Sequence, residues 1–311
     1  MVLDGLPQGL VVDFDALRAE MARRAPGNSE LATPRTEVDE PVFMSGLLNG
    51  VTTGAPITAV IRNHDQHSSD YNGNIPRPSH ADYPAWVRFQ GKNDCRGGGH
   101  FSARLTAGWV AAGALCRQVL AQRGIAVAAK IVRVGQHEGG ELTNGMRMEI
   151  LDARSNGDSV GGVVECVCTG LPAGVGGLMF GGLESRLAQL FYAIPGVKGL
   201  EFGAGFRLAE MRGSAANDPI RIFDGKIFME TNNAGGINGG LSNGMPIVAR
   251  LAFRPTASIG REQKSVDLTI MENVDFRIRG RHDPCIAVRG VPVAEAAMCI
   301  GILDAVLDTG V

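Results

Sequence analysis

The sequence predicts an α+β fold with antiparallel sheets, built as one domain over residues 1–311. Segments with strand-like and helix-like patterns come in runs along the chain and do not alternate strictly. Such runs favour antiparallel sheets over a doubly wound parallel sheet. The chain shows no repeat with a period of roughly 20 to 50 residues and no linker rich in proline and serine, so a single compact unit is expected.

The N-terminal part predicts one helix, two short strands and a long polar loop. A helix is predicted from Asp13 to Arg24, with Asp13 as N-cap and apolar residues recurring at spacings of three and four. Short strands are predicted at Pro41–Leu48 and Pro56–Arg62. The segment Asn63–Pro84 is polar and irregular, and loops of this length usually carry function.

The central part predicts the longest helix, from Ser102 to Arg123, with Gly124 in the position of a helix C′ residue. Apolar or alternating segments predict strands at Ile125–Val134, Met146–Leu151 and Ser159–Cys168.

The C-terminal part predicts a helix at Leu183–Ile194, with its leucines on one face, and strands at Ile247–Phe253 and Ser265–Ile270. A closing helix is predicted at Val291–Leu307, where Pro292 would occupy the first turn, the position at which proline is tolerated.

Composition and charge exclude several classes of protein. The chain has 30 basic and 32 acidic residues, a net charge of −2, and 44% hydrophobic residues. This balance argues against a disordered chain and against a general nucleic-acid binder. No run of 18 apolar residues is present, so no membrane span is expected. Glycine is unusually frequent, with 43 residues, about twice average usage.

Cysteine usage and the N-terminus predict a cytoplasmic protein. Asp4 and Gly5 interrupt the start too early for a signal peptide. The cysteines match neither a disulfide framework nor a zinc ribbon and are expected to be reduced. Cys166 and Cys168 would lie on one face of a strand. The six cysteines are Cys95, Cys116, Cys166, Cys168, Cys285 and Cys299.

Three segments concentrate glycine or arginine in patterns that suit anion binding. Arg96–Arg104 leads into a predicted helix, whose N-terminal N–H groups favour an anion. Thr231–Gly244 contains two Gly-Gly pairs and leads into Arg254–Ser258, a cation with hydroxyls that could hold a phosphate. Arg277–Cys285 holds three arginines followed by His282 and Asp283. The alternatives are, respectively, a plain capped turn, a disordered linker and a solvated turn. The sequence therefore favours binding of strongly anionic small molecules.

The histidines offer one acid–base candidate and a weak metal candidate. His80 lies in the long polar loop, where acid–base work is plausible. His64 and His67 have metal-ligand spacing if helical, but no third ligand is evident, so no metal is expected. His137 is expected at the surface.

Six segments, in consistent order from about Leu3 to Leu307, resemble the chorismate synthase family. They are SGLLNGVTTGAPI (Ser45–Ile57), RPSHADY (Arg77–Tyr83), RGGGHFSAR (Arg96–Arg104), TNNAGGINGGLSNGMPI (Thr231–Ile247), FRPTASI (Phe253–Ile259) and GRHDPC (Gly280–Cys285).

The resemblance implies a β-α-β sandwich and the last step of the shikimate pathway, which leads to the aromatic amino acids. The family converts 5-enolpyruvylshikimate 3-phosphate to chorismate and phosphate by a 1,4-elimination that needs reduced FMN. It also implies homotetramers and a link to NADP. The length leaves no room for an added NAD(P)H-oxidoreductase domain, so an external reductant is expected. Substrate and flavin carry phosphates and carboxylates, which suits several arginines.

Site roles follow from matching positions in the family's motifs. His80 resembles the histidine that protonates the reduced flavin, and Asp283 the aspartate that helps take the proton from flavin N5. Arg35 and Arg104 are expected to bind substrate. The expected flavin contacts, with His100–Ser102 in the family's Arg-Ser-Ser stretch, are His100, Phe101, Ser102, Pro195, Gly196, Gly239, Arg254, Pro255, Thr256, Ala257, Ser258 and Arg281.

The chain departs from the family pattern at its N-terminus, at Glu30 and Thr36, and, more mildly, at His100, which replaces an arginine. The family begins with a strand and a Gly-Glu-Ser-His-Gly loop, whose histidine is a second catalytic acid. This chain starts at the equivalent of the following stretch, Asp4–Gly9, so roughly two dozen residues are expected to be missing. Glu30 and Thr36 replace basic residues, and Glu30 near a polyanion would cost about 1 kcal/mol.

Two alternatives remain open from the sequence. One is a truncated or degenerate FMN-binding homologue without catalytic activity, which an upstream in-frame Gly-x-Ser-His-Gly segment would argue against. The other is a metal hydrolase built on His64, His67 and His80, which metal analysis of the purified protein would test.

Overall fold

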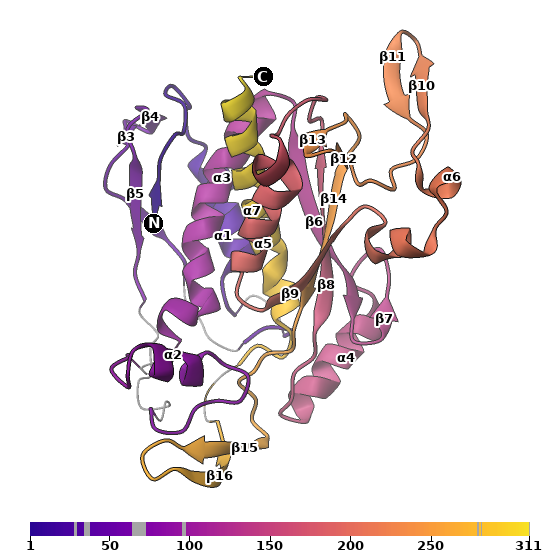
Figure 1. Ribbon diagram of the computed structural model, residues 1–311. Helices are drawn as coiled ribbons and strands as arrows, with labels where there is room; N and C mark the ends of the chain where they lie inside the picture. The colour runs from indigo at the N-terminus through magenta and orange to yellow at the C-terminus, as the bar shows by residue number, and fades with distance from the viewer. Residues whose placement is uncertain are drawn as a thin grey trace.

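A five-stranded antiparallel sheet forms one outer layer of the molecule (Figure 1). The computed structural model describes residues 1–27, 30–33, 38–63, 73–94, 98–278, 280 and 282–310. Side chains along β8 and β14 alternate between buried and partly exposed positions, so one face of the sheet packs on the core. In spatial order the strands are β7 (His137–Glu138), β6 (Ala126–Val134), β8 (Gly162–Thr169), β14 (Ile247–Phe253) and β9 (Val197–Phe202).

Helices form the middle layer, with α3 and α7 packed against each other. Asp13 caps α1 as predicted, since its carboxylate accepts a hydrogen bond from Ala16 N at 2.9 Å. A Cβ at Gly113 would lie 2.4 Å from Ala296 Cα, so glycine permits the close approach of α3 and α7. The helices of this layer are α1 (Phe14–Arg24), α3 (Thr106–Gln122), α5 (Leu183–Ala193) and α7 (Ile286–Thr309).

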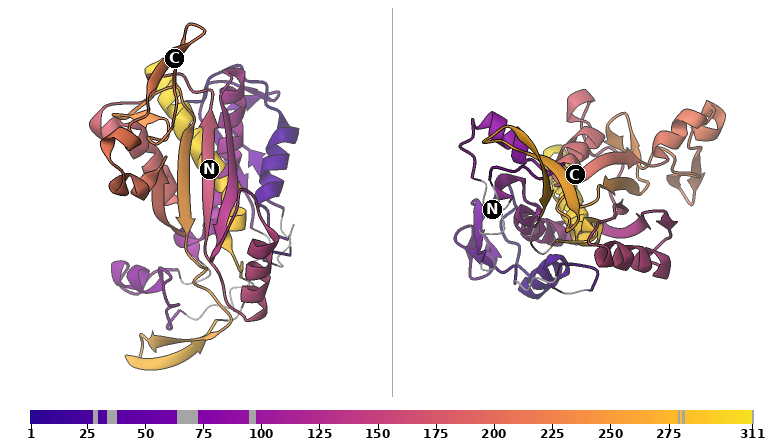
Figure 2. Two further views of the ribbon diagram at one scale, coloured as in Figure 1. Left: turned by 90° about the vertical axis from the view of Figure 1, so that its right-hand side faces the viewer. Right: turned by 90° about the horizontal axis from the view of Figure 1, so that it is seen from below.

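A smaller antiparallel sheet, in the order β1, β5, β2, lies on the other side of the helices (Figures 1 and 2). Its strands are β1 (Val2–Leu3), β5 (Ile57–Ile61) and β2 (Pro41–Phe43). This arrangement is a β-α-β sandwich, and it confirms the predicted α+β class.

Hairpins and further helices lie outside these three layers, and the β10–β11 and β15–β16 hairpins project from opposite ends of the sandwich (Figure 1). The hairpins are β3–β4 (Leu47–Leu48, Val51–Thr52), β10–β11 (Ile220–Phe223, Lys226–Met229), β12–β13 (Ile237–Asn238, Leu241–Ser242) and β15–β16 (Glu262–Asp267, Glu272–Arg277). The remaining helices are α2 (Asp82–Arg88), α4 (Asn144–Ser155) and α6 (Gly213–Ala216), and the 3₁₀ turns are η2 (Gly99–Phe101), η3 (Ala103–Leu105), η4 (Met179–Gly181) and η5 (Gly205–Glu210).

The predicted strand at Met146–Leu151 is wrong, because this segment belongs to helix α4. Thr143 caps the helix by accepting a hydrogen bond from Met146 N at 3.3 Å. Met146 and Ile150 are both buried, and their spacing of four places them on one helical face. The alternation in this segment matched a strand only by coincidence.

Several predicted boundaries also move. α7 begins at Ile286, five residues before the predicted start, so Pro292 lies inside the helix and not in its first turn. α3 begins at Thr106, after the turns η2 and η3 that Ser102 separates. The strand predicted to end at Ile270 ends at Asp267. The segment Pro41–Leu48 splits into β2 and β3, with Gly46 between them at φ 82°.

Helix α7 is long and apolar enough to pass a test for membrane spans, yet 78% of its apolar window is buried inside the molecule. It runs through the middle layer between the two sheets (Figure 1). Its composition therefore reflects its place in the core.

Candidate functional site

His80 lies in a tight turn just before α2, held by Arg77 and Asp82. Its backbone N–H donates to Arg77 O at 3.1 Å. Ser79 adopts φ 61°, an uncommon value for a residue other than glycine. His80 Nδ1 lies 2.6 Å from Asp82 Oδ1 and 2.9 Å from Arg77 Nη2.

The hydrogen bonds to Asp82 indicate which ring nitrogen of His80 is free to exchange a proton. Arg77 can only donate, and its Nε and Nη2 atoms donate to Asp82 at 2.7 and 2.8 Å. Because Asp82 can only accept, the 2.6 Å contact favours the tautomer in which His80 Nδ1–H donates to Asp82. Arg77 Nη2 then donates to Asp82 and not to His80, and Nε2 is left for proton exchange. Partial burial would raise the pKa of Asp82, but hydrogen bonds from Arg77 and His80 outweigh it and hold that pKa well below its usual range.

The Arg254–Ser258 segment, which directly follows β14, lies against the His80 turn. Arg254 Nη1 donates to Ser79 O at 2.6 Å, and Arg77 Nη1 donates to Ser258 Oγ at 3.4 Å. Arg254 N donates to Gly196 O at 2.9 Å. The predicted positions at Gly196, Arg254 and Ser258 therefore lie together with His80.

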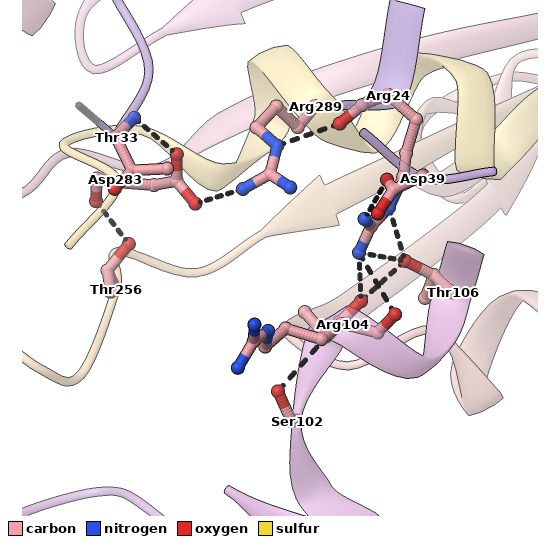
Figure 3. Close-up of polar contacts among 10 residues, drawn as sticks. Arg24, Thr33, Asp39, Ser102, Arg104, Thr106, Thr256, Asp283 and Arg289 are labelled. Carbon is pink, nitrogen blue, oxygen red and sulfur yellow. Dashed lines mark hydrogen bonds and ion pairs between the residues drawn. The ribbon is translucent and has the colours of Figure 1, made fainter. Parts of the chain in front are cut away.

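Asp283, just before α7, contacts the same segment. Thr256 Oγ1 donates to the backbone oxygen of Asp283 at 2.7 Å. The Asp283 carboxylate accepts from Thr33 N at 2.9 Å and from Arg289 Nη1 at 2.8 Å (Figure 3). Both carboxylate oxygens thus have fixed directions.

The segment before α3 presents polar and aromatic side chains at the surface. Ser102 Oγ accepts a hydrogen bond from Arg104 N at 3.2 Å and caps η3. Phe101 is 43% exposed, and His100 is exposed too. Arg104 Nη2 donates to Asn63 Oδ1. Arg24 Nη2 holds this turn by donating to Ala103 O and Arg104 O at 3.0 and 3.1 Å (Figure 3).

Gly239 does not lie with the other predicted residues. It is in the β12–β13 hairpin, before the first residue of β14, whereas Arg254 follows the last. The strand between them spans about 20 Å. A Cβ at Gly239, which has φ 62°, would meet nothing within 4 Å.

Close backbone packing explains other glycines of the same segment. A Cβ at Gly235 would lie 2.3 Å from Gly203 N, and one at Gly240 would lie 2.5 Å from Gly177 O. Part of the glycine excess therefore serves the fold and not a ligand.

Some predicted residues lie outside the described residues: Arg35, Thr36, His64, His67, Cys95, Arg96, Arg279 and Arg281. Among the described residues, no group of three or more His, Cys, Asp or Glu side chains could hold a metal ion. His137 is exposed as predicted, with Nε2 3.7 Å from Glu149. Glu30 is exposed, and its backbone oxygen accepts from Arg154.

Sequence reasoning missed the residues that orient the acid–base candidates. Asp82 follows His80 by two positions in the RPSHADY segment, and that short spacing could have indicated a carboxylate partner. Arg289 was hidden because α7 was predicted to begin at Val291. Arg24 closes α1, where a cation suits the helix C-terminus, so it carried no functional signal.

The arrangement combines two proton-transfer groups with several guanidinium groups and hydroxyls. Arg77 contacts both His80 Nδ1 and Ser258 Oγ, and Thr256 donates to the backbone oxygen of Asp283. Arginines and serines favour phosphate and carboxylate ligands. These residue types suit binding of a polyanion and proton exchange with it.

Comparison with known proteins identifies close relatives. A sequence model of the family described as chorismate synthase matches residues 1–307. The chorismate synthase of Thermococcus gammatolerans is 47% identical over 327 aligned positions, covering 99% of this chain and 92% of that protein. The chorismate synthase of Korarchaeum cryptofilum is 41% identical, covering 98% and 91%. A crystal structure of chorismate synthase superposes with a TM-score of 0.75 at 26% identity, covering 99% of this chain and 87% of that one.

Proposed function

The chain belongs to the chorismate synthase family and is a lyase of that type, and from this premise we propose that it works with reduced FMN. The family's reaction eliminates phosphate from 5-enolpyruvylshikimate 3-phosphate to give chorismate. The observation that carries the proposal is that the Arg254–Ser258 segment is hydrogen-bonded to the backbone of Ser79, next to His80, and to the backbone oxygen of Asp283. Parts of three of the motifs, Arg77–Tyr83, Phe253–Ile259 and Gly280–Cys285, are therefore neighbours in the fold.

The described residues fit a flavin phosphate and an aromatic ring system. Ser102 and Ser258 supply hydroxyls, Arg254 supplies a cation, and Phe101 supplies a half-exposed aromatic face. Hydroxyl and guanidinium groups are the donors that phosphate prefers. We propose that His100–Ser102, Pro195–Gly196 and Arg254–Ser258 hold FMN. Arg281, which lies outside the described residues, would join them. Reduced flavin, when bound, supplies the electron density that assists departure of the phosphate.

His80 and Asp283 form the proposed acid–base set. His80, oriented by Asp82, exchanges a proton at Nε2. Asp283 accepts a proton at its carboxylate, whose two oxygens are already oriented by Thr33 and Arg289. Their different partners suit different tasks, since one group is backed by a carboxylate and the other by a guanidinium.

Arg104 binds the anionic substrate in this proposal, together with Arg35 outside the described residues. The turn that carries Arg104 is anchored by the buried Arg24. A guanidinium on an anchored turn loses less conformational entropy on binding.

The proposal is tested by anaerobic chorismate formation with chemically reduced FMN. The wild-type chain should produce chorismate and phosphate in equal amounts. His80→Ala and Asp283→Ala should each lower turnover by roughly 10²-fold or more while FMN still binds. FMN binding without chorismate would identify a non-catalytic homologue, and wild-type turnover in both variants would refute the acid–base roles.

We also propose a homotetramer, because an apolar hairpin face is left exposed. Ile220, Ile222 and Ile227 are 63%, 75% and 71% exposed, and cross-strand pairing places them with Met229 on one face of β10–β11. Isolated two-stranded hairpins are marginal in water, and exposed apolar patches mark association surfaces. A second copy would also supply Gly239, which is about one strand length from the rest of the site.

Light scattering after size-exclusion chromatography tests this assembly. Ile222→Lys combined with Ile227→Lys should yield smaller particles than the wild type. Ile270→Lys, at a 60% exposed site on the β15–β16 turn, should not. An unchanged tetramer in the double variant would exclude the hairpin as an interface. We propose a cytoplasmic location and an external flavin reductant linked to NADP.

A further inference from the structure

We propose that Arg289 is a positioning residue that fixes the Asp283 carboxylate relative to the Ser102–Arg104 turn, acting through Arg24. The inference rests on the proposed role of Asp283. Neither Arg289 nor Arg24 is among the residues matched to family roles by sequence.

Arg289 connects two parts of the site through two ends of its guanidinium. Its Nη1 donates to Asp283 Oδ2 at 2.8 Å, and its Nε donates to the backbone oxygen of Arg24 at 2.9 Å (Figure 3). A planar guanidinium has fixed donor directions. The two hydrogen bonds therefore set the Asp283 carboxylate against the end of α1.

Arg24 carries the connection onward to the turn that holds Arg104. Its Nη2 donates to Ala103 O and Arg104 O at 3.0 and 3.1 Å. Its Nη1 pairs with Asp39 at 2.5 Å, and the side chains of this pair are only 5% and 8% exposed. A buried, paired arginine is costly to move, so Arg24 is a rigid anchor for both groups.

The surroundings favour positioning over direct substrate binding for Arg289. Its side chain is 18% exposed, and Asp283 is 17% exposed. Its guanidinium uses one edge on Asp283 and another on Arg24. A displacement of about 1 Å at a catalytic group costs roughly 10²-fold in rate, so losing this clamp should affect turnover more than binding.

A double-mutant cycle tests the inference with the full chain. Arg289→Gln should lower kcat by roughly 10- to 100-fold, with KM for substrate and Kd for FMN within about twofold. Arg289→Lys should restore little of kcat, because an ammonium group keeps the charge but does not hold two acceptors in fixed directions. In the Asp283→Asn background, Arg289→Gln should have less than about a twofold further effect, because both changes remove the same function. A crystal structure of Arg289→Gln should show the Asp283 carboxylate displaced.

Arg117→Gln is the matched control, because Arg117 pairs with Glu295 of α7 at 2.7 Å, in the helix core. It should lower the unfolding temperature but leave kcat of the folded protein unchanged. The inference would be overturned if the kcat losses of Arg289→Gln and Asp283→Asn multiplied in the double variant. It would also be overturned if Arg289→Gln raised only KM, or if its crystal structure showed the Asp283 carboxylate in the wild-type position. Wild-type kcat in Asp283→Asn would instead refute the proposed function, so the two failures are distinguishable.

Discussion

Asp82→Asn should impair both stability and turnover, because this carboxylate holds the His80 turn together. Asp82 Oδ2 accepts from Arg77 N and Nε at 3.0 and 2.7 Å, and Oδ1 accepts from Arg77 Nη2 and His80 Nδ1 at 2.8 and 2.6 Å. Asparagine keeps one oxygen and turns an NH₂ group toward two of these donors.

The magnitude follows from the lost hydrogen bonds. Two bonds at about 1 kcal/mol each, an amount that allows for solvent at a partly exposed group, give about 2 kcal/mol. For a chain of this size that amounts to a fall of roughly 3 °C in Tm. Turnover should fall by roughly 10²-fold, because His80 loses the partner that sets its tautomer.

The pH dependence has a definite sign. Hydrogen bonds from Arg77 and His80 outweigh burial and keep the folded-state pKa of Asp82 below its usual range, whereas in the unfolded chain it is about 3.9. The stabilisation is therefore complete above the unfolded value and is lost as pH falls through the folded value. The difference in stability between wild type and Asp82→Asn should be constant from about pH 5 to 8 and shrink below about pH 4.

Thermal unfolding followed by circular dichroism, with anaerobic turnover in parallel, measures both effects. Asp15→Asn is the control, since Asp15 forms an ion pair with Arg18 but its side chain is 90% exposed. Wild-type Tm and turnover in Asp82→Asn would refute the reasoning. So would a stability difference that grows toward acidic pH.

Three further outcomes are expected. Gly113→Ala should destabilise the fold by roughly 1 to 3 kcal/mol in chemical unfolding, since its Cβ would lie 2.4 Å from Ala296. Gly108→Ala on the same helix, where the Cβ would lie 3.3 Å from Met1 Cβ, should cost less. Glu295→Ala should cost about 3 kcal/mol by the same measurement, because this carboxylate is only 3% exposed and ion-paired; a loss below about 0.5 kcal/mol would contradict that role. Burial raises the pKa of all free cysteines in the described part of the chain, which are Cys116, Cys166, Cys168, Cys285 and Cys299. Because the thiolate is the reactive form, mass spectrometry should find these cysteines unalkylated after iodoacetamide treatment of the native protein at pH 8.

Local patterns in the sequence predicted those parts of the fold that local interactions control. The Asp13 cap, the helix that ends before Gly124, and the single buried face of Cys166 and Cys168 are all found in the structure. Each depends on neighbours within a few positions, so each is visible in a short window. At Met146–Leu151 the alternation of apolar and polar residues led to a wrong strand prediction. These six residues fit both the period of a strand and that of a helix, and the Thr143 cap favoured the helix.

The candidate site was likewise predicted only in part. Its residue types and motif positions could be read from the chain, because histidine, aspartate and arginine in glycine-rich loops suggest anion and proton chemistry by themselves. Their grouping could not be read, and one member, Gly239, lies at the far end of β14 from Arg254. The resemblance assigned roles by position and carried no information on distance within one chain.

The sequence by itself therefore determined the α+β class, the four helices of the middle layer, several strands of the two sheets (β2, β5, β6, β8 and β14), and which residues are acid–base candidates. Tertiary structure alone decided what orients Asp283. Asp283 accepts from Thr33, a partner 250 positions away, and Arg289 donates to Arg24 across 265 positions. Contacts at such separation depend on how the helices and sheets pack, and no local pattern of residues encodes them.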